Sequence, residues 1–416
     1  MSNNIYNIGK LLSANVIAQA IGFLVYPILT RMYAPEDFAV LSLFVSIAGV
    51  LSIIATAEYQ YAIVLPKGEE RARALVCLSS LILIGLTAIV CLSIPFAQPI
   101  AALFKAPELA HWWWLMPLSV LGLGAWNILN YWYIRRKAFS RISGYQMTQG
   151  VFAASGKVGF GALGWLHGGM IMATVIAPLL SLAISIGLAW KKHMHGLFSA
   201  RMEEMKAAAR EYANFPKFNL PRALVNAAAQ SLPIWMLTPV FGLDAVGRFS
   251  LAFMVSFLPL NILARACYQV LFQHVSELVQ QRLSIRSILL RFTLWMGGGM
   301  IVGMTVIYIV VPQLVTFLFG AEWLESAEII RRLFPYLMLT PICGTLCFLS
   351  DVFGKQKIAL WMETGYVIAI GLAIGAGIYM NCFMGAISLF AWTRFAYLTI
   401  QLCWFISLAR KYNKSL

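Results

Sequence analysis

The stretch ALVCLSSLILIGLTAIVCLSIPF (Ala74–Phe96) contains no charged residue, and it decides the fold class. A helix crosses the roughly 30 Å hydrocarbon core of a bilayer with about 20 apolar residues, because it rises about 1.5 Å per residue. Similar stretches recur, and hydropathy predicts about twelve spans. They lie near residues 8–30, 38–64, 74–96, 113–134, 143–166, 169–190, 219–241, 246–272, 292–317, 333–353, 358–380 and 384–408. The sequence therefore predicts an all-helical, multi-pass membrane protein.

The composition agrees with lipid as the solvent. Hydrophobic residues make up 61% of the chain and charged residues only 11%, whereas a soluble domain carries about 25% charged residues to face water. The first span is too long for the apolar region of a signal peptide, and we expect it to be retained. A large soluble domain is excluded by this composition.

The distribution of Lys and Arg predicts the orientation in the membrane. Most of the 31 basic residues fall in segments that are cytoplasmic if the N-terminus is inside, as the positive-inside rule requires. The expected outer loops hold only Arg31, Lys105, Arg248, Arg331 and Arg332. We therefore expect both termini to be cytoplasmic. The net charge of +15 is explained by topology and by contact with anionic lipid, so nucleic acid is not an expected partner.

A charged linker divides the chain into two similar halves. We expect a first bundle of about six helices at 1–190, a cytoplasmic linker at 191–218 with an amphipathic helix near Arg201–Tyr212, and a second bundle at 219–416. Asn15-x3-Gln19 in the first span matches Asn226-x3-Gln230 in the seventh. Two further matches follow in the same order, which favours a duplicated unit.

Polar side chains at helical spacing mark faces that are turned away from lipid. The residues that we expect on such faces are Asn15, Gln19, Gln60, Gln149 and Tyr397. Small and polar residues also serve as contacts between helices, so lining a cavity and packing both remain open for them.

Charged residues inside spans are harder to explain by packing. Lys157, Arg265 and Arg394 lie within predicted spans, where each charge costs at least ~2.5–3.5 kcal/mol at the centre of a helix in lipid. Glu58 and Glu363 are acidic residues in the same environment. They either neutralise the cations structurally or titrate with a coupling ion. Together these residues predict a polar, net cationic cavity lined by both halves, which would attract an anion such as a phosphate.

Catalytic and metal-binding patterns are missing from the sequence. Cys343 and Cys347 share a helix face without a His or carboxylate partner, and the five histidines lie at span edges or in loops. We expect neither an enzyme nor a metal site nor a cofactor. A membrane glycan polymerase or ligase is disfavoured, because the longest outer segments, near 97–112 and 318–332, are too short to hold a glycan.

Three stretches carry a resemblance to a known family: ILTRMYAPEDFAVLSLF (Ile28–Phe44), the region Tyr212–Pro259 and GKQKIAL (Gly354–Leu360). Over its whole length the chain resembles the polysaccharide-export branch of the multidrug/oligosaccharidyl-lipid/polysaccharide (MOP) exporter superfamily, and it is similar to O-antigen flippases of the Wzx type. Relatives usually have Gly where this chain has Ala39, while Gly247 keeps it in the second half.

The resemblance implies a V-shaped fold of two bundles in the bacterial inner membrane, and a role in O-antigen or lipopolysaccharide biosynthesis. The implied substrate is an undecaprenyl-diphosphate-linked oligosaccharide, moved to the periplasmic leaflet by alternating access with H⁺ or Na⁺ antiport. A downstream polymerase and a chain-length regulator are implied partners. The residues assigned to the diphosphate and glycan are Arg31, Lys157, Arg265 and Arg394. A multidrug or lipid II exporter on the same fold is the alternative.

Overall fold

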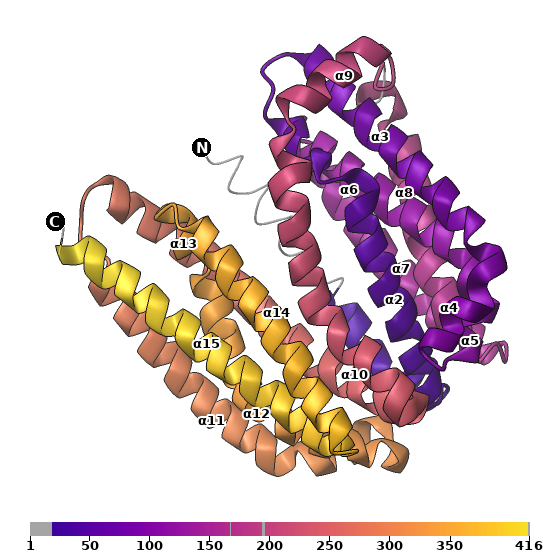
Figure 1. Ribbon diagram of the computed structural model, residues 1–416, viewed down its shortest axis with the longest axis vertical. Coiled ribbons are helices and arrows are strands. Elements are labelled where there is room, and N and C mark those ends of the chain that lie inside the picture. Colours follow the sequence, from indigo (N-terminus) through magenta and orange to yellow (C-terminus); the bar gives the residue numbers. More distant parts are fainter. Residues whose placement is uncertain (1–18, 167, 194–195, 415–416) are drawn as a thin grey trace. The chain divides into compact units, whose positions relative to one another are not determined.

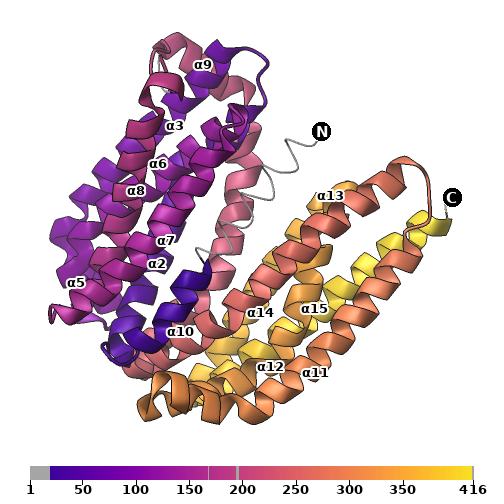
Figure 2. The same ribbon diagram turned by 180° about the vertical axis from the view of Figure 1, so that it is seen from behind.

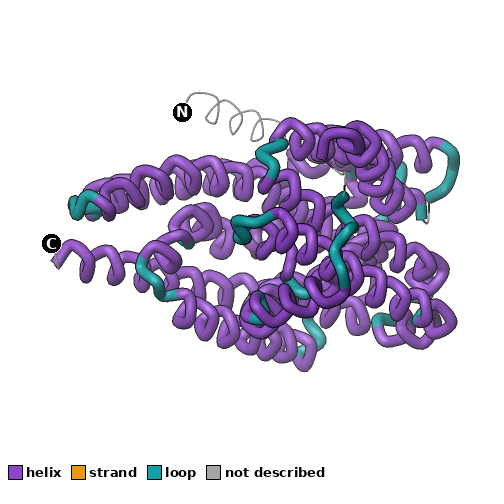
Figure 3. Tube along the Cα trace, turned by 90° about the horizontal axis from the view of Figure 1, so that it is seen from above, coloured by secondary structure: helices purple, strands orange, loops and turns teal. Residues whose placement is uncertain are grey.

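The computed structural model describes residues 19–166, 168–193 and 196–414. In these ranges the chain forms helices and loops only (Figure 3). The chain divides into two compact units, Met1–Ser231 and Leu232–Leu416. Each unit is described by itself below.

The helices of the first unit follow the hydropathy pattern closely. A helical segment covers Gln19–Leu29, and Figure 1 shows α2, α3, α6 and α8 as neighbouring rods within this unit. The elements are α2 (Pro35–Thr56), η1 (Tyr59–Val64), α3 (Glu69–Leu92), η2 (Ile94–Phe96), α4 (Ala97–Leu103), α5 (Pro107–Trp112), η3 (Trp113–Leu115), α6 (Met116–Arg135), α7 (Phe139–Ala162), α8 (Gly169–His193), α9 (Met202–Glu211) and η4 (Phe215–Asn219).

Long helices α11, α12, α14 and α15 pack against one another in the second unit (Figure 2). Helix α10 (Leu220–Gln280) begins in the first unit, and most of it belongs to the second. The remaining elements are α11 (Arg286–Phe319), η5 (Ala321–Trp323), α12 (Leu324–Leu346), α13 (Phe348–Val352), α14 (Gln356–Tyr379) and α15 (Phe383–Lys414).

Eight helices among the described residues are long and apolar enough to cross a membrane. Two spans expected from the sequence, 219–241 and 246–272, lie within one of these eight, Phe215–Gln280, and non-helical backbone at Gly242 (φ 82°) separates them. Helices α6 and α7, on expected spans 113–134 and 143–166, are not among the eight. Both carry many polar residues, as in the α7 segment SRISGYQMTQ. The first expected span is described only from Gln19 onward.

The second expected span, 38–64, is wrong as a single helix. Helix α2 begins at Pro35, a residue preformed for a first helical turn, and the Asp37 carboxylate accepts a hydrogen bond from the Ala34 N–H at 3.1 Å. It ends at Thr56, because Ala57 and Glu58 both adopt the left-handed conformation, with φ of 46° and 63°. A short 3₁₀ helix follows. This break places Glu58 after the spanning helix instead of inside it.

The segments expected outside the membrane are largely helical. Segment 97–112 forms the short helices α4 and α5, and most of 318–332 forms η5 and the start of α12. Arg248, expected in an outer loop, lies on α10. Its guanidinium pairs with Asp244 and Glu325. The predicted amphipathic helix near Arg201–Tyr212 is confirmed as α9.

Each unit has its own apolar core. In the first unit the largest fully buried side chains include Trp132 and Tyr133 of α6, which join a cluster with Leu75 of α3. In the second, Phe348 and Phe405 bring α13 and α15 against the buried end of α10. These cores fix the helices that carry the polar residues described next.

Candidate functional site

An arginine surrounded by tyrosines lies inside the second unit. The Arg394 guanidinium carbon is 4.4 Å from the ring centroid of Tyr366, 5.3 Å from that of Tyr336 and 5.5 Å from that of Tyr397. A cation within about 6 Å of an aromatic centroid is attracted by the negative face of the ring. We call Tyr336, Tyr366 and Tyr397 the tyrosine cage. It lowers the cost of holding a charge in an apolar bundle.

Three helices supply this site. Tyr336 comes from α12, Tyr366 from α14, and Arg394 and Tyr397 from α15. The last two are three residues apart, so they lie on one face of their helix. Tyr366 and Tyr397 stack with centroids 4.3 Å apart, and the Gln401 amide donates to the Tyr397 hydroxyl at 3.4 Å.

The cage does not use every polar group of the cation. Arg394 is half-buried, and its Nε has no hydrogen-bond partner among the described residues. Glu363 lies one turn before Tyr366 on α14 and interacts electrostatically with Tyr397. Arginine stays protonated under all ordinary conditions and matches phosphate oxygens with paired N–H groups. The arrangement can therefore hold a permanent positive charge that recognises an anion.

A buried carboxyl marks the break between α2 and α3 in the first unit. Glu58 is 5% exposed and Gln60 is 3% exposed. Burial raises the pKa of the Glu58 carboxyl to about 7, and a hydrogen bond with the Gln60 side chain opposes the rise. The nearby Tyr61 ring lies 4.7 Å from that of Tyr131 on α6. The Glu58 carboxyl can therefore gain and lose a proton near neutral pH.

Of the other predicted cations, Lys157 is half-buried, whereas Arg31 and Arg265 are exposed. Lys157 is half-buried on α7, and its backbone carbonyl accepts a hydrogen bond from the Tyr33 hydroxyl at 2.7 Å. Gln149 lies two turns earlier on the same helix and is also half-buried. Arg31 is exposed in the turn after Gln19–Leu29, and Arg265 is exposed on α10.

The structure brings some predicted residues together and separates others. Glu363, Arg394 and Tyr397 form one group in the second unit, and Glu58 and Gln60 form another in the first. Gln19 is half-buried, and Asn15 lies outside the described residues.

Sequence reasoning missed one aromatic residue at these sites. Tyr336 is the third wall of the tyrosine cage. Its position within a largely apolar helix was the available signal, but most aromatic residues in such helices face lipid or the core.

The fold has known counterparts among solved transporters. The lipid II flippase MurJ in an inward closed conformation aligns with a TM-score of 0.73 at 13% identity, over 97% of this chain and 90% of that one. An outward-facing multidrug resistance MATE family transporter of the MOP superfamily aligns with a TM-score of 0.65 at 13% identity, over 98% of this chain and 96% of that one. The fold is therefore that of MOP superfamily transporters.

Comparisons of the sequence show the family to which the chain belongs. A family model described as "Polysaccharide biosynthesis protein" matches residues 28–328, and the chain belongs to this family. The succinoglycan biosynthesis transport protein ExoT of Rhizobium meliloti (strain 1021) is 23% identical over 371 residues, which are 85% of this chain and 70% of that protein. The chain is thus a membrane protein of this polysaccharide biosynthesis family, with a fold that it shares with these solved transporters.

Proposed function

We propose that this protein is a transporter, a flippase for an undecaprenyl-diphosphate-linked oligosaccharide, which is a repeat unit of O-antigen or another surface polysaccharide. It moves this lipid from the cytoplasmic to the periplasmic leaflet of the bacterial inner membrane. The family match over residues 28–328 supports a polysaccharide precursor as cargo. The observation that carries the proposal is Arg394 and its tyrosine cage, a fixed cation inside a helical bundle.

The chemistry of the cargo fits this site. A diphosphate carries negative charge on oxygens that accept charge-assisted hydrogen bonds from a guanidinium. Tyrosine hydroxyls and ring faces next to the cation supply further polar and apolar contacts for sugars. Arg31, Lys157 and Arg265 are proposed as further cations for the diphosphate and glycan, each to be tested separately. Asn15, Gln19, Gln60 and Gln149 are proposed to line the route.

The direction of transport needs an energy source. We propose alternating access between two bundles of about six helices with both termini cytoplasmic, driven by antiport of H⁺ or Na⁺. Glu58 supports H⁺ as the coupling ion, because its carboxyl is buried and its pKa of about 7 lies within the physiological range. Glu363 is the second coupling candidate. A polymerase and a chain-length regulator would act on the product.

Charge-removal variants of one helix test the cargo site. Arg394→Met keeps the length of the side chain and removes its charge. Arg410→Met removes the same charge from the same helix, α15, at an exposed position sixteen residues away. Loss of a charge-assisted hydrogen bond costs roughly 1.5–3 kcal/mol, so we expect about 10- to 100-fold weaker transport in Arg394→Met.

The assay is surface-polysaccharide export in a strain that lacks its own flippase, with protein levels matched by immunoblot. Export should be restored by the wild type and by Arg410→Met, and strongly reduced with Arg394→Met. Normal export with Arg394→Met would refute the cation site. Restoration of lipid II or drug export, instead of polysaccharide export, would favour the alternative exporter function.

A further inference from the structure

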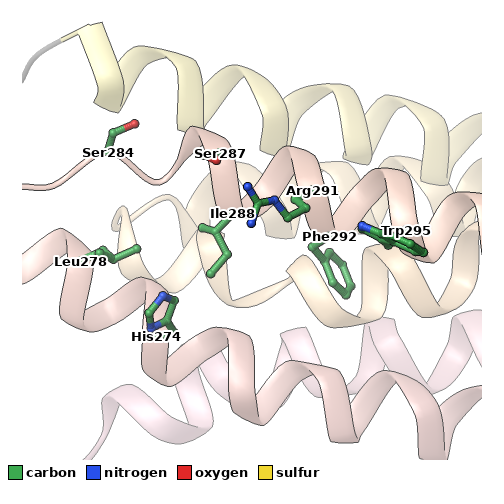
Figure 4. A pocket seen from close by; sticks show the side chains of 8 residues that line it. All are labelled: His274, Leu278, Ser284, Ser287, Ile288, Arg291, Phe292 and Trp295. Atoms are coloured by element: carbon green, nitrogen blue, oxygen red, sulfur yellow. The ribbon is translucent and has the colours of Figure 1, made fainter.

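A cavity of about 500 Å³ lies between the end of α10 and the beginning of α11 (Figure 4). This volume is within the ~300–1,000 Å³ range of small-molecule sites. Its polar lining residues are His274, Ser284, Ser287 and Arg291, and its aromatic ones are Phe292 and Trp295. We call it the α10–α11 pocket. It lies within the second unit and shares no residue with the tyrosine cage.

The pocket has a polar end and an apolar end. Ser284 lies in the connection just before α11 and Ser287 in the first turn of that helix. Trp295 is eight residues after Ser287, roughly 12 Å further along the helix axis. Arg291 lies between them, and its guanidinium extends back toward Ser287 (Figure 4). Trp295 is 79% exposed, as expected for an aromatic side chain at a membrane surface. This polarity matches a ligand with a polar head and an apolar tail.

Hydrogen bonds hold the polar end in place before any ligand arrives. The Ile285 N–H donates to the Asn413 side-chain oxygen on α15 at 3.1 Å, and Ile285 is fully buried. The Leu283 N–H donates to the carbonyl of Leu278 at 2.8 Å, which closes the connection back onto α10. A preformed site avoids the entropy cost of ordering a loop on binding.

The charged residues at the pocket determine whether it favours an anionic or a cationic ligand. Arg291 contributes a permanent positive charge, and none of the described residues that line the pocket is acidic. The nearest carboxylate along α10, Glu277, accepts a hydrogen bond from Gln273 at 3.1 Å. Arg286, the first residue of α11, adds positive charge at the same end. An anionic group is therefore favoured at the polar end.

We infer that the α10–α11 pocket binds an anionic phospholipid of the bilayer, with its phosphate at Arg291 and the two serines and its acyl chain against Phe292 and Trp295. Basic residues at the ends of spanning helices attract anionic headgroups in the cytoplasmic leaflet. The combination of a guanidinium, hydroxyl groups and an adjoining aromatic wall suits a phosphodiester that is attached to an apolar chain. This lipid is distinct from the transported cargo.

Native mass spectrometry of the full-length protein in detergent tests this inference. The protein is titrated with phosphatidylglycerol or with phosphatidylcholine of the same acyl chains, and the bound fraction is measured. We expect the wild type to bind phosphatidylglycerol more tightly than phosphatidylcholine. Arg291→Gln should weaken phosphatidylglycerol binding by about tenfold, because it removes one charge-assisted contact to phosphate.

Arg282→Gln is the matched control. It removes the same charge from the same end of the unit, but Arg282 does not line the pocket. Its phosphatidylglycerol binding should stay near that of the wild type. Equal weakening by Arg282→Gln would show attraction by overall charge and would overturn the site.

Two further arms complete the test. Equal binding of phosphatidylglycerol and phosphatidylcholine would refute the anionic headgroup. Glycerol 3-phosphate, which lacks the acyl chain, should compete poorly. Competition at the same concentration as the lipid would show a site for free phosphate esters and would refute the lipid assignment. Thermal unfolding of each variant confirms that the protein remains folded, and polysaccharide export is not needed as a readout.

Discussion

The buried carboxyl of Glu58 makes the stability of the protein depend on pH. Its pKa is about 7 in the folded protein against 4.5 for a solvated carboxyl. At about 1.4 kcal/mol per pH unit, this difference corresponds to roughly 3 kcal/mol. Between these two pKa values the folded state binds the proton more tightly than the unfolded state does. Stability is therefore lost as the pH rises from 4.5 to about 7, and the full cost of the buried charge is present above that range.

Glu58→Gln tests this reasoning, because glutamine keeps the shape of the side chain but cannot ionise. Relative to the wild type, the variant should gain roughly 3 kcal/mol of unfolding free energy between about pH 5 and about pH 8. Glu36→Gln is the control, since Glu36 is exposed in the first turn of α2. Its difference from the wild type should change little over the same range.

The measurement is denaturant unfolding in detergent micelles, followed by tryptophan fluorescence at both pH values. Every other titrating group is common to the variant and the wild type, so its effect cancels in the comparison. The difference in unfolding free energy between Glu58→Gln and the wild type could instead stay constant within about 1 kcal/mol from about pH 5 to about pH 8. Glu58 would then be ionised over this whole range, and the burial argument would fail.

Three further substitutions test the packing of single units. Gly377→Ala on α14 would place its new methyl group against the backbone of Ala386 on α15, so we expect a loss of at least ~1–3 kcal/mol. Gly375→Ala meets no atom within 4 Å and should be neutral or stabilising by about 0.5–1 kcal/mol in the same unfolding assay. Arg135→Lys keeps the charge but cannot reach three carbonyl groups at once. We expect a lower melting temperature with unchanged membrane orientation, read by cysteine labelling, and an unchanged melting temperature would contradict this role.

Hydropathy predicted the positions of most helices, because lipid requires long apolar segments whatever their neighbours. The break after α2 could not be predicted in the same way. It depends on left-handed backbone at Ala57 and Glu58, residue types that rarely adopt it. The division of 220–280 into two helical parts was predicted, because the gap between the expected spans 219–241 and 246–272 contains Gly242, whose φ of 82° interrupts the helix.

The candidate site was predictable only where one helix supplies it. Arg394 and Tyr397 are three residues apart, so their shared face follows from helical periodicity. Tyr336 precedes Arg394 by dozens of residues and comes from another helix. Their contact depends on how α12 and α15 pack, which no local pattern encodes. For the same reason the sequence did not reveal the α10–α11 pocket.

The guanidinium of Arg135 joins two parts of the first unit mechanically. It donates to the carbonyls of Ile63, Pro66 and Gly68, at 3.3, 2.6 and 3.1 Å. These carbonyls belong to the connection between α2 and α3, whereas Arg135 ends α6. A pull on α6 along its axis is therefore transmitted directly to that connection. Sliding between α6 and the α2–α3 connection would require three charge-assisted hydrogen bonds to break, so these hydrogen bonds couple the two parts in any rearrangement of the unit.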